Sequence, residues 1–154
     1  MRVNFRALSM AVLGLCLAGL ASAEKQVNKS DLPGPVQKTA EEQSRGYAVR
    51  GYSVDKEDGK LEYEVEMTSA GHTRDVTIAP DGQLMEVEEQ VAMGALPADV
   101  RSGLESKAGN GKITKIESLR KHGTIVAYEA QVMTAGKHSE VQVGPDGKAL
   151  DHEE

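Results

Sequence analysis

Two stretches decide the fold: Tyr63-Glu64-Val65-Glu66-Met67 and Tyr128-Glu129-Ala130-Gln131-Val132. Each is followed by an Ala-Gly pair, an apolar-polar-apolar triplet and a Pro-Asp-Gly turn. These positions are Ala70-Gly71, Val76-Thr77-Ile78 and Pro80-Asp81-Gly82 in the first copy, and Ala135-Gly136, Val141-Gln142-Val143 and Pro145-Asp146-Gly147 in the second. Each of these motifs of the first copy recurs in the second with the offset that separates Tyr63 from Tyr128. A repeat with a constant offset predicts two copies of one structural unit.

The first stretch alternates strictly between apolar and acidic side chains. Leu61, Tyr63, Val65 and Met67 face one way, and Glu62, Glu64 and Glu66 face the other. This period of two predicts a strand with one buried and one solvated face. We expect extended segments at 47–54, 61–67, 73–78 and 84–88 in the first copy and at 113–119, 125–133, 138–143 and 149–152 in the second, with a turn at Asp58-Gly59.

A helix is expected before the strands of each copy. Leu32-Pro33 and Leu96-Pro97 place a proline in the first turn, where its missing N–H costs nothing. Apolar residues then recur at helical spacing, which predicts helices at about 32–45 and 97–109. The expected fold class is α+β: a tandem repeat of a helix and a three- or four-stranded antiparallel meander, with the helices packed on one face of the sheet. Units of about 60 residues are small for a stable core, so we expect one compact body.

The N-terminus has the pattern of a secretory signal peptide. Arg2 and Arg6 precede an apolar run, and Ala21-Ser22-Ala23 is a small-x-small cleavage motif. The apolar run is too short for a stable membrane anchor, and Cys16 follows Leu15 instead of the small residue typical of a lipidation site. The predicted organisation is a signal peptide at 1–23, a linker at 24–30 and repeats at 31–91 and 95–154. Cleavage near Ala23 would leave a periplasmic or secreted protein.

Charge and cysteine content narrow the classes of partner. Cys16 is the single cysteine, so the expected mature chain has none and no disulfide stabilises it. Residues 31–91 include 6 basic and 14 acidic residues, whereas residues 95–154 include 8 basic and 9 acidic residues. Nucleic acid and anionic lipid are poor partners for such a chain. A protein or peptide partner, basic in character, fits the charge.

These features together resemble the PepSY-like periplasmic proteins. The Leu-Pro helix start, the Tyr-Glu-Val strand and the Pro-Asp-Gly-Lys/Gln turn recur in tandem behind a signal peptide, over about residues 31–154. The architecture of that family is similar to the β-lactamase inhibitor protein (BLIP). The resemblance implies a secreted α+β binding module that restrains or regulates a peptidase or another envelope protein. The chain departs from the inhibitor proteins because it lacks their disulfides and has few aromatic residues.

No catalytic motif is present in the sequence. A nucleophile needs an adjacent base, and the four histidines stand at predicted turns or strand ends, away from any serine motif: His72, His122, His138 and His152. We therefore expect a protein that is not an enzyme and needs no cofactor. A weak divalent-cation site is the alternative, formed by Glu86, Glu88 and His152 if the last strands of the two copies lie close together.

The acidic side of the predicted sheet is the candidate partner-binding surface. In the first copy it carries six acidic residues: Glu62, Glu64, Glu66, Asp75, Glu86 and Glu88. The second copy places Ala127, Glu129, Gln131, Glu140 and Gln142 at the corresponding positions, which is nearly neutral. The acidic side serves either solubility and protection against edge pairing, or the docking of a cationic partner on the first copy.

Overall fold

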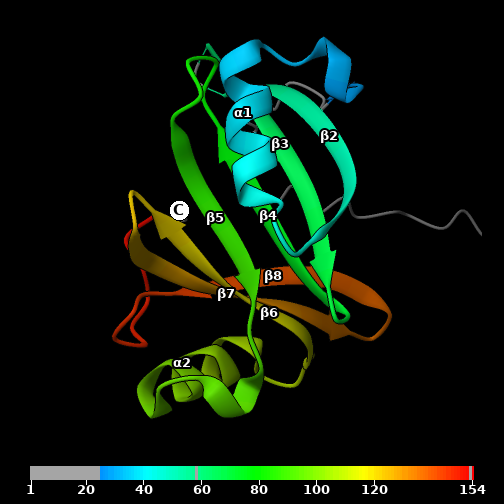
Figure 1. Cartoon of the computed structure of the whole chain (residues 1–154). Coiled ribbons are helices and arrows are strands. Elements are labelled where there is room, and N and C mark those ends of the chain that lie inside the picture. The colour runs from blue at the N-terminus through cyan, green and yellow to red at the C-terminus, as the bar shows by residue number, and fades with distance from the viewer. Residues whose placement is uncertain (1–24, 58, 153) are drawn as a thin grey trace, which may run out of the picture.

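The computed structural model describes residues 25–57, 59–152 and 154 of the 154-residue chain. The predicted signal peptide, Cys16 and the cleavage site at Ala23 lie outside the described residues. The described part is an α+β fold with one eight-stranded antiparallel sheet and two α-helices (Figure 1). The strands lie in the sheet in their order along the chain, from β1 to β8.

The first half of the sheet follows helix α1 (Gly34–Gln43) and consists of β2 (Ala48–Glu57), β3 (Lys60–Ser69), β4 (His72–Ile78) and β5 (Leu84–Gln90). The second half follows α2 (Ala98–Ala108) and consists of β6 (Lys112–Lys121), β7 (Thr124–Thr134) and β8 (Lys137–Val143). Short 3-10 helices, η1 (Lys29–Asp31) and η2 (Met93–Ala95), precede the two α-helices. Both predicted helices and seven of the eight predicted strands are present, with shifted ends. The origin of the two halves as repeats stays a prediction.

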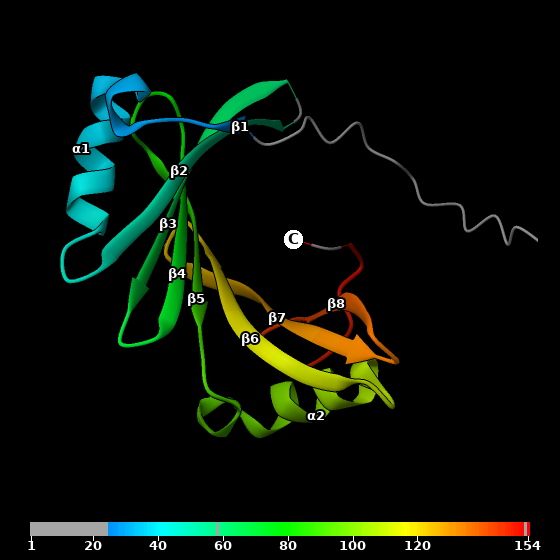
Figure 2. The ribbon, with the colours of Figure 1, turned by 90° about the vertical axis from the view of Figure 1, so that its right-hand side faces the viewer.

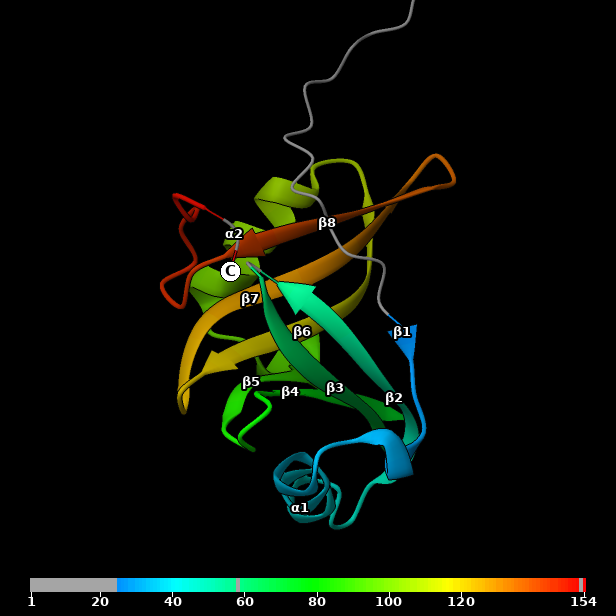
Figure 3. The same ribbon diagram turned by 90° about the horizontal axis from the view of Figure 1, so that it is seen from above.

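Both helices cover the same face of the sheet. Val36 and Ala40 of α1 pack on the apolar residues of β3, β4 and β5, and Val100 and Leu104 of α2 pack on those of β6, β7 and β8. Side-by-side pairing of Val87 with Arg120 continues this face from β5 to β6. Figure 2 shows the helices on the outside of the bent sheet and the C-terminal end of the chain on the other side. Seen from above, β6 to β8 run across the direction of β2 to β5 (Figure 3).

Two expectations about the ends of the sheet need correction. Lys25 and Gln26, assigned to a linker, form strand β1 (Lys25–Gln26) and pair with Val54 and Ser53. The strand predicted at 149–152 is absent, because these residues are in bends and irregular structure. Its counterpart β5 pairs on both sides, with β4 and with β6, whereas a strand after β8 would have a neighbour on one side only. Residue 58 of the predicted turn lies outside the described residues.

Candidate functional site

The sheet face opposite the helices, called the open face below, collects the acidic residues that the sequence singles out. Glu66 pairs with Asp75, and Asp75 pairs with Glu88, so these three carboxyl groups form a row across β3, β4 and β5. A parallel row is formed by Glu64, Thr77 and Glu86. Glu62 lies beside it in the pocket that also contains Thr77 and Glu86. The register therefore brings all six predicted residues onto one face of adjoining strands.

The second half of the open face carries more charged groups than the sequence analysis predicts, but two lysines, Lys115 and Lys121, stand against the added acids Glu117 and Glu154. Glu129 accepts a hydrogen bond from Gln142 Nε2 at 2.8 Å, and Glu154 Oε2 lies 3.4 Å from Lys121 Nζ. Glu117 on β6 also lies on this face, and it contacts carboxyl groups from the first half. Carboxyl groups on this face therefore lie on both sides of the β5–β6 pairing, with Lys115 and Lys121 among them.

Three carboxyl groups meet at the centre of the open face: Asp75, Glu88 and Glu117, called the carboxyl cluster below. One oxygen from each lies within 4.8 Å of the others. The Glu117 side chain is only 4% exposed; its Oε1 lies 2.6 Å from Lys115 Nζ and accepts a hydrogen bond from the Thr73 hydroxyl at 3.2 Å. Residues from three strands build this cluster, and one lysine offsets part of its charge.

Crowding of these acids changes their titration. Burial, together with the negative charges of Glu117, Glu86 and Glu129, raises the pKa of Glu88 to about 8. Burial also raises the pKa of Asp75, although the Met67 N–H, which donates to Asp75 Oδ1 at 3.4 Å, acts in the opposite direction. Glu88 therefore holds a proton at neutral pH, which relieves the repulsion within the carboxyl cluster.

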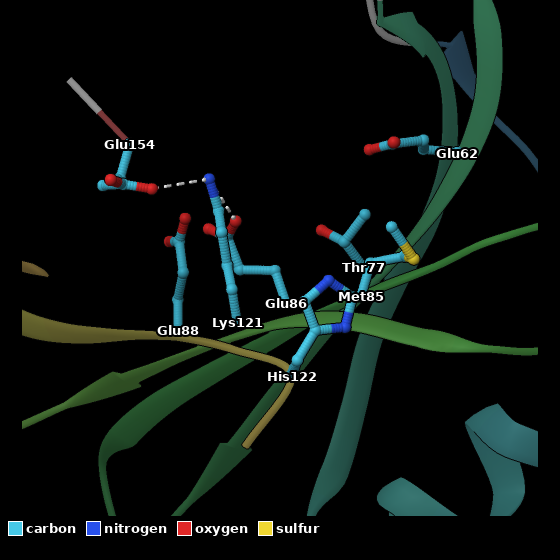
Figure 4. Close-up of a pocket in the computed structure, with 8 residues that line it drawn as sticks. All are labelled: Glu62, Thr77, Met85, Glu86, Glu88, Lys121, His122 and Glu154. Carbon is cyan, nitrogen blue, oxygen red and sulfur yellow. Dashed lines mark hydrogen bonds and ion pairs between the residues drawn. The ribbon is translucent and has the colours of Figure 1, made fainter. Parts of the chain in front are cut away.

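A polar pocket of about 350 Å³ lies beside the carboxyl cluster (Figure 4). Lys121 stands in it between Glu86 and Glu154, and its Nζ is 3.4 Å from a carboxylate oxygen of each. Burial lowers the pKa of Lys121, but the two carboxylates outweigh it and raise that pKa overall. Met85 and His122 also contribute to the wall (Figure 4). The pocket is lined mainly by charged groups, which suits a polar or charged ligand better than an apolar one.

A second, smaller pocket lies on β2, β3 and β4 and is called the β2–β4 pocket below. It has a volume of about 150 Å³. Two hydroxyl-bearing residues and three acidic residues line it: Ser53, Thr77, Asp55, Glu62 and Glu64. Ser53 pairs with Glu64 across the β2–β3 register, and Asp55 pairs with Glu62. The two pockets share Glu62 and Thr77, so they are neighbouring parts of one surface.

The predicted metal ligands are not gathered as the sequence analysis expects. Glu86 pairs with Lys121, and His152 is largely exposed, with its Nε2 3.8 Å from Glu154 Oε1. Glu88 belongs to the carboxyl cluster instead. The other histidines are at the start of β4 (His72), in the β6–β7 turn (His122) and near the start of β8 (His138). The absence of enzymatic activity stays a prediction.

Glu117 and Ser53 are not among the site residues that the sequence analysis singles out. Each residue has the expected alternation within its strand, with Ile116 and Tyr52 facing the helices beside them. However, the contacts of Glu117 depend on the β5–β6 pairing, which joins segments separated by a helix, whereas Ser53 stands out only through the burial of its hydroxyl group. The alternation along each strand predicts which face of the sheet these side chains lie on, but it does not predict the order of the strands.

Three solved structures share this fold. A protein of Bacteroides eggerthii assigned to the periplasm aligns with a TM-score of 0.61 at 16% identity, covering 77% of this chain and 86% of its own. A DUF2874 family protein from Bacteroides ovatus aligns with a TM-score of 0.59 at 18% identity. The alignment covers 78% of this chain and 85% of that protein. A BLIP-like protein from Bacteroides fragilis aligns with a TM-score of 0.56 at 14% identity. The alignment covers 77% of this chain and 83% of that protein. The chain has a BLIP-like fold.

These similarities show the fold alone, because the sequence identities are low. No protein-family model matches the chain, and neither does any curated protein. The resemblance to PepSY-like proteins thus stays a prediction. No helix among the described residues has the length and apolar composition needed to cross a membrane.

Proposed function

We propose that this protein is a non-catalytic, periplasmic binding module whose open face docks a basic protein or peptide. The single observation that carries the proposal is the excess of carboxyl groups on the open face, which is greatest on its first half. One face of the sheet is used by the helices to build the core, and the other carries carboxyl groups from six neighbouring strands, β2 to β7. A surface of this charge attracts cationic partners and speeds their association.

The arrangement of the charges favours docking over simple solubility. Solubility requires exposed charges spread over the surface, whereas Asp75, Glu88 and Glu117 are crowded within 4.8 Å at the centre of one face. Repulsion on neighbouring strands lowers stability, and part of it is relieved here by a proton on Glu88. A basic side chain placed over this face would relieve the remaining repulsion between the carboxyl groups. Relief of this repulsion in the complex favours binding.

The proposed location rests on the N-terminal signal pattern and on the BLIP-like fold, which is shared with a protein assigned to the periplasm. The fold neighbour that is called BLIP-like is consistent with a non-catalytic binding module. A peptidase or another envelope protein is the class of partner that the PepSY-like resemblance suggests, and we include it as the finer form of the proposal.

The proposal is tested with a synthetic octalysine peptide and a charge-reversal variant. Replacing Glu62, Glu64 and Glu66 by Lys should weaken octalysine binding at least about tenfold at low salt, because three attractions become repulsions. Binding to the unaltered protein should also weaken as salt rises from about 20 to 200 mM. Fluorescence anisotropy of a labelled peptide measures both effects.

The matched control reverses three exposed acids on the helices: Glu41, Glu42 and Glu105. This variant has the same net charge as the first, and circular dichroism checks that both are folded. Equal binding by the two variants would mean that the open face is only a solvated surface. Divalent cations are tested in the same protein by calorimetry with Ca²⁺ and Zn²⁺. Lys115 pairs with Glu117, and Glu88 holds a proton, so only part of the charge of the carboxyl cluster remains for a divalent cation; cation binding is an outcome of this test and not our proposal.

A further inference from the structure

The Ser53 hydroxyl group is buried without a hydrogen-bond partner. Ser53 is 1% exposed, and its Oγ has no donor or acceptor within bonding distance. A buried hydroxyl group that makes no hydrogen bond destabilises the folded state. The neighbouring Tyr52 packs against the core, so alternation along β2 directs Ser53 to the open face, where it lines the β2–β4 pocket. Ser53 therefore belongs to the wall of a space that a ligand can fill.

The surroundings of this hydroxyl group define the charge of that ligand. Three carboxyl groups, of Asp55, Glu62 and Glu64, line the same pocket, and Thr77 supplies a second hydroxyl group. All five side chains contribute oxygen atoms, and none contributes a positive charge. A small cation that donates several hydrogen bonds matches this set, whereas an anion or an apolar group does not.

We propose that the β2–β4 pocket receives the ammonium group of one lysine side chain of the basic partner; this inference rests on the proposed function. An ammonium group is a compact charge with three donors, which fits Ser53 Oγ and the adjoining carboxylates. The pocket volume of about 150 Å³ admits the end of one side chain.

The experiment compares octalysine with the same peptide in which every lysine is ε-trimethylated, using the full-length mature protein. Trimethylation keeps the charge and removes the donors. The unaltered protein should bind octalysine about five- to tenfold more tightly than the trimethylated peptide. Ser53→Ala should remove most of this preference. It should also leave the free protein equally or more stable to heat, because an unsatisfied hydroxyl group is lost. Ser69→Ala, at the far end of β3, should retain the preference.

The possible outcomes separate this inference from the proposed function. If neither peptide binds, both fail. If both peptides bind equally and their binding weakens with salt, the open face docks basic partners but has no ammonium pocket, and this inference is overturned. If 1 mM CaCl₂ abolishes the preference through a site that Ser53→Ala removes, a divalent ion is the occupant and the inference is again overturned. A preference that Ser53→Ala alone removes supports it.

Discussion

Glu88 lies half-buried between two other carboxyl groups, and its titration makes the stability of the fold depend on pH. Its pKa is about 8 in the folded protein, against an ordinary value of 4.5. Because the folded state holds this proton more tightly, the stabilisation is complete below about pH 4.5 and is lost as the pH rises through about 8. Glu88→Gln imitates the protonated group, so the variant should exceed the unaltered protein in free energy of unfolding by about 1–3 kcal/mol at pH 9. The difference should shrink toward pH 5.

Urea denaturation at several pH values, followed by circular dichroism, measures this effect. Glu140→Gln is the control, because Glu140 is an exposed carboxyl group of β8 outside the carboxyl cluster. It should change the free energy of unfolding little at any pH. A Glu88→Gln profile parallel to that of the unaltered protein would show that Glu88 titrates normally.

At the scale of elements, the repeated Pro-Asp-Gly turns hold the helices on the sheet. Gly82 has φ +88°, and a Cβ placed on it would lie 2.8 Å from the Pro35 carbonyl oxygen of helix α1. Gly147 has φ +76°, and a Cβ there would overlap the Asp99 carbonyl oxygen of α2. Thr39 Oγ1 also donates to the Gly82 carbonyl at 2.7 Å. Each turn thus requires glycine for its backbone conformation and for its contact with a helix.

This double requirement predicts unequal effects of two alanine substitutions. Gly136→Ala, at φ +79° with open space around it, should cost about 1–2 kcal/mol for the left-handed backbone alone. Gly147→Ala should cost at least about 2 kcal/mol more, because the helix has to move away. Urea denaturation of both variants checks this. Equal losses would mean that the turn does not hold α2 in place.

Local chemistry explains which elements the sequence predicts correctly. The alternation in 61–67 places Val65 and Met67 in the core and the glutamates on the open face, because it requires only the strand period. The alternation cannot show whether a strand gains a second neighbour: β5 also pairs with β6, whereas residues 149–152 come after β8, the last strand of the sheet. Glu117 shows the same limit at the site, since its contact with Asp75 and Glu88 depends on strands joined far apart in the chain.

For the whole molecule, the open face is one surface built by both halves of the chain. The β5–β6 register places Glu86 beside Lys121 and Glu88 beside Leu119, so a partner that docks at the centre contacts residues from both halves. The helices, in contrast, lie on the opposite side and should take no part in binding (Figure 2). Binding should therefore leave a footprint that is continuous across the sheet and absent from the helices.

The most direct test is the footprint of octalysine on the ¹⁵N–¹H correlation spectrum of the mature protein. We expect the amide signals of residues 53–55, 62–66, 75–77, 86–88 and 117–121 to shift together in a saturable titration. Signals of α1 and α2 should stay in place, and the shifts should be lost when Glu62, Glu64 and Glu66 are replaced by Lys. Shifts centred on the helices, or an unchanged spectrum at millimolar peptide and low salt, would contradict the claim that the open face is a docking surface.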